Sequence, residues 1–395
     1  MQPLAVFNAG SSSIKFAVFE ENSEYPILFR GQVEKLGVAP RLVVKNSSGE
    51  KLIEKSWSAK ELDHGSATKT ILETAVSLLG GERVRAVGHR VVHGGTRFTS
   101  PVLVNADILP ELRKLCPLAP LHQPHNLAAI EAIAEAAPHL PQVACFDTAF
   151  HRQQPEIAQM FALPKEIADL GIRRYGFHGL SYEFIAMRLH EVAPALAEGR
   201  IVVAHLGNGS SLCAMRGGRS VATTMGFTAV DGLMMGTRCG SIDPGVLIYL
   251  VDELGMDARA LEDLIYKRCG LIGVSGISSD MQTLRGSKED RAAVAIKLFV
   301  YRIVREIGSM VAAAGGIDAI VFTGGIGQND AQTRAEIALG CDWMGLKLSN
   351  DQNMAAATRI DSEDSAVAAF VIATDEEQMI ARHTRALFAS APVRA

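Results

Sequence analysis

Cysteine is scarce in this chain and occurs in no recognisable metal-binding pattern. The six cysteines are scattered, with no C-x-x-C pair and no histidines at zinc spacing, which is typical of reduced thiols in a cytoplasmic protein. There is also no apolar run that approaches the ~20 residues needed to span a bilayer. The N-terminus lacks a charged segment followed by an apolar one, so we expect neither secretion nor membrane insertion.

An excess of positive charge is lacking as well. The net charge is −4 and the pI is about 6.3, which gives no general attraction to nucleic acid or to anionic membranes. Any anion site must therefore be built from a few local basic residues. Hydrophobic residues make up 48% and charged residues 21% of the 395 residues, as in a globular protein whose length indicates two domains.

The most distinctive polar stretch is N-A-G-S-S-S-I-K, Asn8 to Lys15. It separates two short apolar runs that favour strand, so it predicts the turn of a tight hairpin. A glycine, serine hydroxyls and the Lys15 ammonium group are suited to binding phosphate. An ordinary serine-rich surface turn is an equally good interpretation of this segment alone. Its spacing is not that of the G-x-x-x-x-G-K-[ST] phosphate loop.

Residues 201–215, I-V-V-A-H-L-G-N-G-S-S-L-C-A-M, have the same plan of apolar strand, Gly/Ser/Asn turn and apolar strand. This is the one internal repeat that we find, and it lies near the midpoint of the chain. Two such hairpins predict a duplicated domain with one phosphate loop per copy and a cleft lined by both loops. A third glycine cluster, at 323–329, lies between a strand and a helix. It favours nucleotide binding only weakly, because helix packing alone can require glycine.

Hydrophobic periodicity and turn residues predict a mixed α/β chain. Strands are expected over residues 4–7, 14–19, 26–33, 41–45, 84–92, 141–146, on both sides of the turn in 201–215, and over 317–322 and 367–373. Helices are expected over residues 66–79, 107–115, 126–136, 181–192, 243–254, 257–268, 289–314, from 330 onward, and over 375–387. The proline-rich stretch 117–126 predicts neither regular state.

Three anion-suited loops in an acidic chain indicate a polyphosphate ligand, and phosphoryl transfer also needs positive charge, a metal site and an acceptor pocket. Arg90 follows a buried strand, and Arg238 lies between glycines, where a ligand contact is favoured over a structural bridge. His178 lies in a glycine-flanked loop, although a lone histidine is more often structural. Asp147 follows a strand and could hold magnesium, position the acceptor or cap a helix. Glu376 could bind magnesium, but a favourable interaction with the helix dipole is its default explanation.

The chain resembles the acetate kinase family from end to end. The motifs that carry the resemblance are long and occur in one order: N-A-G-S-S-S-I-K at Asn8, G-H-R-V-V-H-G-G at Gly88, L-A-P-L-H at Leu118, F-D-T-A-F-H at Phe146, Y-G-F-H-G at Tyr175, H-L-G-N-G-S-S at His205, M-G-T-R-C-G-S-I-D-P at Met235, F-T-G-G-I-G-Q-N at Phe322 and Glu376-Glu377. The family belongs to the superfamily of sugar kinases, actin and the heat-shock ATPases. The resemblance therefore implies two duplicated actin-like (ribonuclease H-like) α/β domains with an active-site cleft between them: residues 1–150 with 378–395, and residues 151–377.

The resemblance implies reversible, Mg2+-dependent transfer of the ATP γ-phosphoryl group to acetate, giving acetyl phosphate and ADP by direct in-line transfer in a cytoplasmic homodimer. Mn2+ is expected to be able to replace Mg2+. The implied catalytic residues are Asp147, His178, Arg238 and Arg90, and the implied metal ligands are Asn8 and Glu376. The acetate site is implied to comprise Arg90, Val92, Leu121, Phe177 and Ala229. The nucleotide site is implied to comprise Lys15, Ser11, Ser13, His205, Leu206, Gly207, Asn208, Gly209, Asp280, Met281, Gln282, Gly324, Gly325, Ile326, Gly327, Gln328 and Asn329.

Three positions depart from the pattern of the family. Ala229 stands where many relatives have proline, and a smaller wall would let the acetate pocket admit propionate. Gln328 replaces the usual glutamate, and Gln282 stands where arginine is frequent, a contact that Arg285 could take over. The alternatives are propionate as the main substrate and a non-catalytic nucleotide-binding module. Such a module would be expected to have lost the catalytic arginines and aspartate, which this chain retains.

Overall fold

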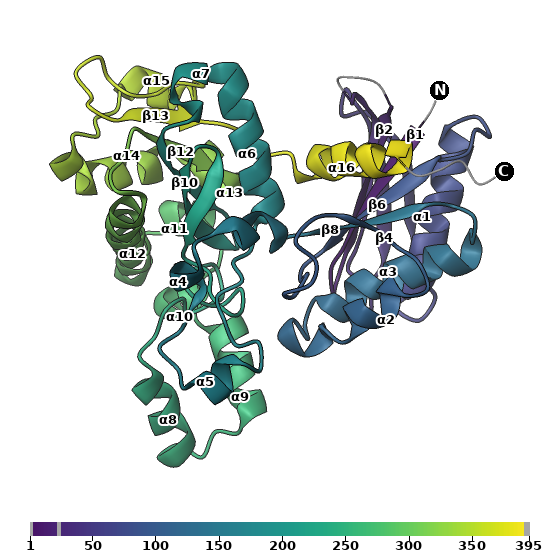
Figure 1. Cartoon of the computed structure of the whole chain (residues 1–395), viewed down its shortest axis with the longest axis horizontal. Helices are drawn as coiled ribbons and strands as arrows, with labels where there is room; N and C mark the ends of the chain where they lie inside the picture. The colour runs from purple at the N-terminus through teal and green to yellow at the C-terminus, as the bar shows by residue number, and fades with distance from the viewer. Residues whose placement is uncertain (1–2, 22–24, 391–395) are drawn as a thin grey trace. The chain divides into compact units, whose positions relative to one another are not determined.

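The structure is a computed structural model that describes residues 3–21 and 25–390. The chain forms two compact units, the first of residues 1–150 with 375–395 and the second of residues 151–374 (Figure 1). The first unit contains the whole of the last helix, α16 (Glu376–Ser390). The boundary expected from the sequence, between residues 377 and 378, falls inside this helix. No helix in the described ranges is long and apolar enough to cross a membrane.

The first unit is built on an eight-stranded sheet with the strand order β5-β4-β3-β2-β1-β6-β8-β7. Strands β1, β6 and β8 are parallel, and the other neighbours pair antiparallel. The bounds are β1 (Pro3–Ala9), β2 (Ile14–Glu20), β3 (Ile27–Glu34), β4 (Arg41–Asn46), β5 (Lys51–Ser56), β6 (Ala86–Val91), β7 (Val102–Leu103) and β8 (Gln142–Phe146).

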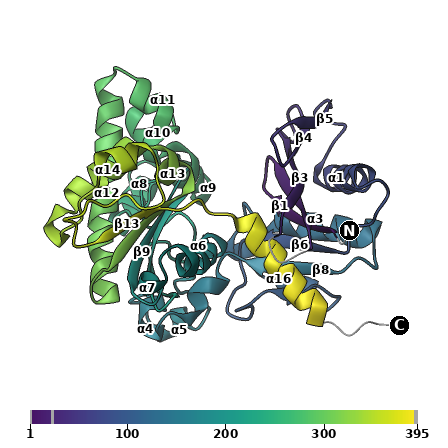
Figure 2. The ribbon, with the colours of Figure 1, turned by 90° about the horizontal axis from the view of Figure 1, so that it is seen from above.

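Helices cover both faces of this sheet. As Figure 2 shows, α1 (His64–Leu78) and α3 (Gln123–Ala136) pack on one face, and α16 crosses the other over β1, β6 and β8. The short α2 (Ile108–Arg113) packs against α3. Alternation along β2 explains the two faces: Ile14 and Phe16 enter the core on the α1 side, while Lys15 is exposed on the side of α16.

The second unit repeats this plan in a five-stranded sheet with the order β11-β10-β9-β12-β13. Its bounds are β9 (Arg200–Leu206), β10 (Ser210–Arg216), β11 (Arg219–Thr223), β12 (Ala319–Thr323) and β13 (Ala368–Val371). In the second unit three antiparallel strands are followed by two more that run parallel to the first. The matching order β3-β2-β1-β6-β8 in the first unit confirms the duplicated α/β fold predicted from the repeated hairpins.

The long helix α12 (Asp290–Ala314) packs against β9, β10 and β11, and α6 (Gly179–Val192) covers the other face of the sheet (Figures 1 and 2). The helix predicted over residues 289–314 is confirmed, and it buries one apolar stripe in which Phe299, Ile303 and Ile307 are fully buried. The remaining helices are α4 (Glu156–Gln159), α5 (Lys165–Ala168), α7 (Pro194–Ala197), α8 (Pro244–Asp252), α9 (Ala258–Asp263), α10 (Gly270–Ser275), α11 (Met281–Gly286), α13 (Gly324–Asn329), α14 (Ala331–Gly340) and α15 (Asn350–Met354).

Two local predictions were wrong. The proline-rich stretch 117–126 is largely helical: a 3-10 turn spans Cys116–Leu118, and α3 begins at Gln123 with Pro124 in its first turn. Proline is tolerated there because the first N–H groups of a helix have no partner within the helix. The glycine cluster after β12 is likewise helical, as α13, rather than a loop before a single helix.

Candidate active site

The turn of the first hairpin is shorter than its polar sequence indicates. Asn8 and Lys15 are paired residues within β1 and β2, and Ala9 pairs with Ile14 as the last rung. Only residues 10–13 form the turn, closed by a 2.8 Å hydrogen bond from the Gly10 N–H to the Ser13 carbonyl. Directly paired residues project from the same face of a sheet, so Asn8 and Lys15 present their side chains together.

Two buried or half-buried helix residues hold this turn in place. The Asn126 Nδ2 of α3 donates to the Ala9 carbonyl at 2.6 Å, and the His64 Nε2 of α1 lies 2.9 Å from the Gly10 carbonyl. Asn126 also accepts the Val92 N–H through Oδ1 at 3.0 Å. One side chain therefore ties the first turn to the segment after β6, and this connection was not visible in the sequence.

Three predicted site residues lie where neighbouring parallel strands end. Asn8 is the second-last residue of β1, Arg90 the second-last of β6, and Asp147 follows β8 directly. The carboxyl ends of parallel strands are where open α/β sheets place ligands. Glu376 begins α16, which packs on these same strands. The fold of the first unit thus brings together four residues that are far apart in the chain.

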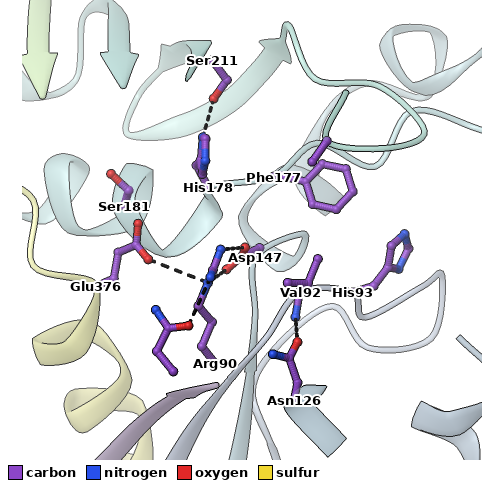
Figure 3. A network of polar contacts seen from close by, with 12 residues as sticks. Arg90, Val92, His93, Asn126, Asp147, Phe177, His178, Ser181, Ser211 and Glu376 are labelled. Atoms are coloured by element: carbon purple, nitrogen blue, oxygen red, sulfur yellow. Dashed lines mark hydrogen bonds and ion pairs between the residues drawn. The ribbon is translucent and has the colours of Figure 1, made fainter. Parts of the chain in front are cut away.

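Arg90 is the centre of this group (Figure 3). Its Nε and Nη2 donate to the two Asp147 carboxylate oxygens at 3.0 and 2.6 Å, and its Nη1 donates to Asn8 Oδ1 at 3.2 Å. Glu376 Oε2 lies 3.9 Å from Nε. A guanidinium carries one N–H on Nε and two on each Nη, so these bonds leave one N–H on each Nη for a further acceptor. Arg90 is therefore fixed in position and still able to bind an anion.

The charges in this group keep the Arg90 guanidinium positively charged, with side-chain oxygens around it. Burial alone would lower the pKa of Arg90, but the Asp147 and Glu376 carboxylates outweigh it and raise that pKa above its ordinary value. The Asp147 side chain is 2% exposed, so Arg90 compensates its buried charge. The described residues contain no group of three or more His, Cys, Asp or Glu placed so that it could hold a metal ion. Asn8, Asp147 and Glu376 instead offer the one or two carboxylates and amide oxygen that suit Mg2+ when substrate phosphates and water complete its shell.

Lys15 lies further out on the same face of the sheet. It lines a cavity of about 500 Å³ whose other charged residues include Arg30, Lys45 and Glu377. Burial and Asp375 raise the pKa of Glu377, while Arg30 and Lys15 oppose that rise. Ser11 is exposed and Ser13 half-buried. The predicted phosphate-binding groups are therefore accessible on the turn and beside it.

The predicted apolar contacts of acetate are divided between the two units. Val92 is buried and Leu121 half-buried in the first unit, whereas Phe177 is buried and Ala229 half-buried in the second. Whether these four side chains form one pocket stays a prediction. His89, next to Arg90, is structural: it is buried, its Nε2 lies 2.7 Å from Gln142 Oε1, and burial lowers its pKa to about 4.

In the second unit, His178 and Arg238 converge on the second hairpin turn. A Cβ built on Gly209 would lie 3.3 Å from His178 Nε2 and 3.7 Å from Arg238 Nη1. A backbone contact helps to fix Arg238, since its Nη1 donates to the Ala229 carbonyl at 2.9 Å. This contact uses the backbone of Ala229, so it does not depend on which side chain stands there. These two predicted catalytic residues thus lie together beside the turn.

Eight of the nucleotide residues predicted from the sequence line one cavity of about 790 Å³. It is lined by Gly207 and Asn208 of the hairpin turn, by Ser279, Asp280, Met281, Gln282 and Arg285, and by Gly325, Ile326, Asn329, Asp330 and Gln332. His205 and Leu206 belong to β9, just before the turn. Gly324 has a positive φ of 76°, and a Cβ there would meet the Leu206 carbonyl at 2.6 Å. Glycine is therefore needed to seat α13 against the end of β9.

Three residues near this cavity have structural partners of their own. Asp280 caps α11, because its Oδ1 accepts the Thr283 N–H at 2.7 Å. Arg285 donates two 2.8 Å hydrogen bonds to the Glu336 carboxylate. Because these donors are already used, Arg285 does not simply replace the arginine that is missing at Gln282. Gln328 does not line the cavity. Its carbonyl and that of Gly327 accept hydrogen bonds from the buried Arg334. Arg334 thereby stabilises the end of α13, and it was not identified from the sequence.

The sequence matches the model of the Acetokinase family over residues 4–382. It is 52% identical over 386 residues to the acetate kinase of Rhodopseudomonas palustris (strain ATCC BAA-98 / CGA009), covering 96% of this chain and 97% of that protein. Among solved structures, a propionate kinase from Francisella tularensis subsp. tularensis SCHU S4 superposes with a TM-score of 0.93 at 35% identity, and Porphyromonas gingivalis acetate kinase with 0.89 at 36%. Both alignments cover 98% of this chain and 100% of the other. The chain belongs to the acetokinase family.

Proposed function

We propose that this chain is an acetate kinase, which transfers the γ-phosphoryl group of ATP reversibly to acetate and yields acetyl phosphate and ADP. The observation that carries the proposal is the fixed Arg90 guanidinium, held by Asp147 and Asn8 at the carboxyl ends of parallel strands with one N–H free on each Nη. Such a fork matches the two oxygens of a carboxylate. Membership of the acetokinase family supports acetate as that carboxylate.

In the proposed reaction an acetate oxygen forms a bond to the γ-phosphorus while the bond from that phosphorus to the bridging oxygen of ADP breaks. Acetate is already an anion, so no general base is required. Asp147 therefore acts by orienting Arg90 and the reacting groups rather than by accepting a proton. His178 and Arg238 supply donors to the phosphoryl oxygens, where charge is spread in the transition state.

Mg2+ is the proposed metal, with Asn8 and Glu376 as its protein ligands and Mn2+ as a substitute. When bound with ATP it would neutralise charge on the phosphate oxygens. Lys15, Ser11 and Ser13 contribute further donors to the phosphates. The cavity of about 790 Å³ around Gly207, Gln282 and Gly325 is proposed to hold the adenosine part of ATP, since its volume is in the usual range for sites of that kind.

Propionate is proposed as a second substrate. Ala229 removes the proline ring that narrows the acetate site in many relatives, whereas Val92 keeps the methyl end small. A structural neighbour named as a propionate kinase supports this tolerance. The test is a kcat/KM series from formate to butyrate. We expect acetate to be the best substrate, propionate within about tenfold and butyrate far lower. A higher value for propionate than for acetate would make propionate kinase the better description.

A homodimer is proposed from an uncovered apolar surface in the second unit. Helix α8, P-G-V-L-I-Y-L-V-D, has no buried residue, and Ile248, Tyr249 and Leu254 are 61%, 58% and 62% exposed. Helix α12 of the same unit also exposes apolar side chains, among them Leu298 and Tyr301. An apolar face of this kind is typical of a subunit interface. Sedimentation should give a dimer that Tyr249→Asp dissociates; a monomeric wild type would contradict the proposal.

The cytoplasm is the proposed location. None of the six cysteines forms a disulfide in the structure, as expected of a protein kept in a reducing compartment.

A further inference from the structure

Hydroxyl groups from the first turn of α6 and from β10 contact two predicted site histidines of the second unit, His205 and His178. His178 precedes α6, and Ser181 and Tyr182 lie in that helix's first turn. Ser211 lies in β10, beyond the second hairpin turn. Ser181, Tyr182 and Ser211 are all fully buried. None of them was a predicted site residue, because hydroxyl groups at such positions are indistinguishable in sequence from those of an ordinary core.

Ser211 Oγ lies between a phenol and an imidazole. It is 2.5 Å from Tyr182 Oη and 2.9 Å from His178 Nδ1 (Figure 3 shows the second contact). A serine hydroxyl can accept from one group while donating its single proton to another. The tyrosine phenol is the more acidic of the two hydroxyls, so it is the better donor to the serine oxygen. A chain of bonds in one direction, Tyr182 to Ser211 to His178, is also mutually strengthening.

The backbone of His178 supports a role beyond helix capping. Its φ of 57° and ψ of 23° place it in the left-handed region, which costs about 1–2 kcal/mol for a residue other than glycine. Its side chain makes no capping bond to α6. The strained conformation instead directs Nδ1 to Ser211 and leaves Nε2 beside Gly209 and Arg238. Outliers of this kind cluster at functional sites.

We propose that Tyr182 and Ser211 form a hydrogen-bond relay that holds His178 as the Nε2–H tautomer. Because Nδ1 accepts the Ser211 proton, the imidazole must carry its own proton on Nε2. Nε2–H is then a fixed donor in the space that it shares with Arg238 above Gly209. Tyr182 and Ser211 are positioning residues, since they act through His178. Their contribution to turnover rests on the proposed function, whereas the tautomer itself does not.

The test is NMR of the full chain with 15N-labelled histidine, in which long-range 1H–15N correlations report the protonated nitrogen of each imidazole. Signals of His178 are assigned by their loss in His178→Asn. We expect the Nε2–H tautomer in the wild type and its partial or complete conversion to Nδ1–H in Ser211→Ala. Tyr182→Phe should give a smaller change in the same direction. An Nδ1–H tautomer in the wild type would overturn the relay even if neither variant folds, and so would an unchanged tautomer in Ser211→Ala.

The second unit offers a matched control. Ser220 is also buried, and its Oγ lies 2.9 Å from the Nδ1 of a different buried histidine, His151. Ser220→Ala should alter the His151 signals and leave the His178 tautomer unchanged. A second control is Tyr175→Phe, which removes a buried phenol that donates to the Gly171 carbonyl at 2.7 Å. A shift of His178 to Nδ1–H in either control would contradict the relay, because neither hydroxyl belongs to it.

Kinetics supply the second measurement. Ser211→Ala should lower kcat by about 10- to 100-fold, the size expected when a catalytic group is misoriented. The KM values for ATP and acetate should stay within about twofold. Unchanged kcat together with a converted tautomer would show that turnover does not need the relay, and would overturn the positioning role. A wild type with the Nε2–H tautomer but no acetate phosphorylation would overturn the proposed function and leave the relay supported.

Discussion

Arg90 combines two properties that are hard to obtain in one side chain, a fixed position and free donors. Asp147 and Asn8 take three of its N–H groups, so the guanidinium loses little further freedom when it binds a substrate. The buried Asp147 carboxylate fixes the guanidinium through Nε and Nη2, and the N–H groups that are not used remain able to donate to an anion. A lysine would offer neither the planar fork nor the simultaneous contacts.

Replacement of Arg90 by alanine should therefore abolish most of the chemistry. Arg90→Ala removes the carboxylate fork and leaves Asp147 buried without its cation, and we expect kcat to fall by roughly 10³-fold or more. Binding of ATP, measured by calorimetry, should change little, because most nucleotide contacts are proposed to lie in the second unit and those proposed in the first, Lys15, Ser11 and Ser13, are unchanged in this variant. Arg113→Ala, at an exposed arginine that pairs with Glu131, is the matched control and should keep normal turnover.

Arg238→Ala should show the same separation of turnover from binding. It removes a donor beside His178 and Gly209, so we expect a loss of kcat of similar size with ATP affinity retained. The measurement is again steady-state kinetics together with calorimetry. Near-normal kcat in this variant would remove Arg238 from the set of catalytic residues.

Buried His89 should make stability depend on pH. Burial lowers the pKa of folded His89 to about 4, despite the opposing hydrogen bond to Gln142, whereas an unfolded histidine titrates near ~6.5. Above that pH both states are neutral and His89 contributes no pH dependence. Below it only the unfolded chain takes up the proton, so the free energy of unfolding should fall by about 1.4 kcal/mol per pH unit until about pH 4.

Urea denaturation of the wild type and of His89→Gln between pH 7 and pH 5 measures this effect. The variant should be less stable at pH 7, because the buried contact with Gln142 is altered, but its stability should fall less steeply with decreasing pH. Equal pH slopes in the two proteins would show that His89 does not remain neutral in the folded chain.

At the residue scale, the sequence was sufficient for the reactive groups and insufficient for the groups that hold them. Arg90, Asp147 and Arg238 stand in distinctive glycine-rich or strand-end contexts. Asn126 and Tyr182 lie on helices, where a polar residue that faces inward has the same sequence signature as one that faces solvent. Such residues are identified only when the partner across the structure is known.

At the scale of elements, α16 depends on a close approach to β6 at Gly88. A Cβ built on Gly88 would lie 2.2 Å from Thr384 Oγ1 and 2.5 Å from Ile380 Cγ2. Both are buried residues of α16, so neither can move aside into solvent. The same helix begins with Glu376, which faces Arg90. The packing of one glycine therefore determines where a proposed metal ligand lies.

Gly88→Ala should displace α16 and destabilise the first unit. We expect a loss of about 1–3 kcal/mol, the usual cost of inserting a methyl group into a well-packed core, together with a higher KM for Mg2+. Urea denaturation and metal titration measure the two effects. The control is Gly286→Ala in α11, where a Cβ would have no atom within 4 Å; it should be neutral or slightly stabilising. Equal stability of the two variants would contradict close packing at Gly88.

The elements themselves were predicted well where their hydrophobic pattern was strong. Helix α12 and the hairpin β1–β2 were predicted within a few residues of their ends. Strands β5, β7 and β11 were not predicted. β5 is mostly exposed at the edge of its sheet, β7 has two residues, and β11 follows a tight turn with positive φ at Gly217 and Gly218. Such strands depend on pairing with a neighbour, which a single-sequence pattern does not reveal.

At the scale of the whole molecule, duplication explains the distribution of the site residues. Each unit has a hairpin whose turn carries polar groups; in the first unit further site residues lie where parallel strands end, and in the second unit they lie beside the turn. The first copy holds Arg90 and Asp147, and the second holds His178 and Arg238. The repeat could be predicted from the sequence because both copies retain the apolar-turn-apolar pattern. That β12 and β13 correspond to β6 and β8 is evident only from the order of the strands in the two sheets.

The most direct test of the proposed function is trapping of acetyl phosphate with hydroxylamine during turnover with ATP, Mg2+ and acetate. We predict acetyl hydroxamate that requires both ATP and acetate and forms in step with ADP, and its loss in Arg90→Ala. ATP binding without hydroxamate would identify a nucleotide-binding module. ADP formation that does not depend on acetate would identify a different acceptor, and either result would contradict the assignment as an acetate kinase.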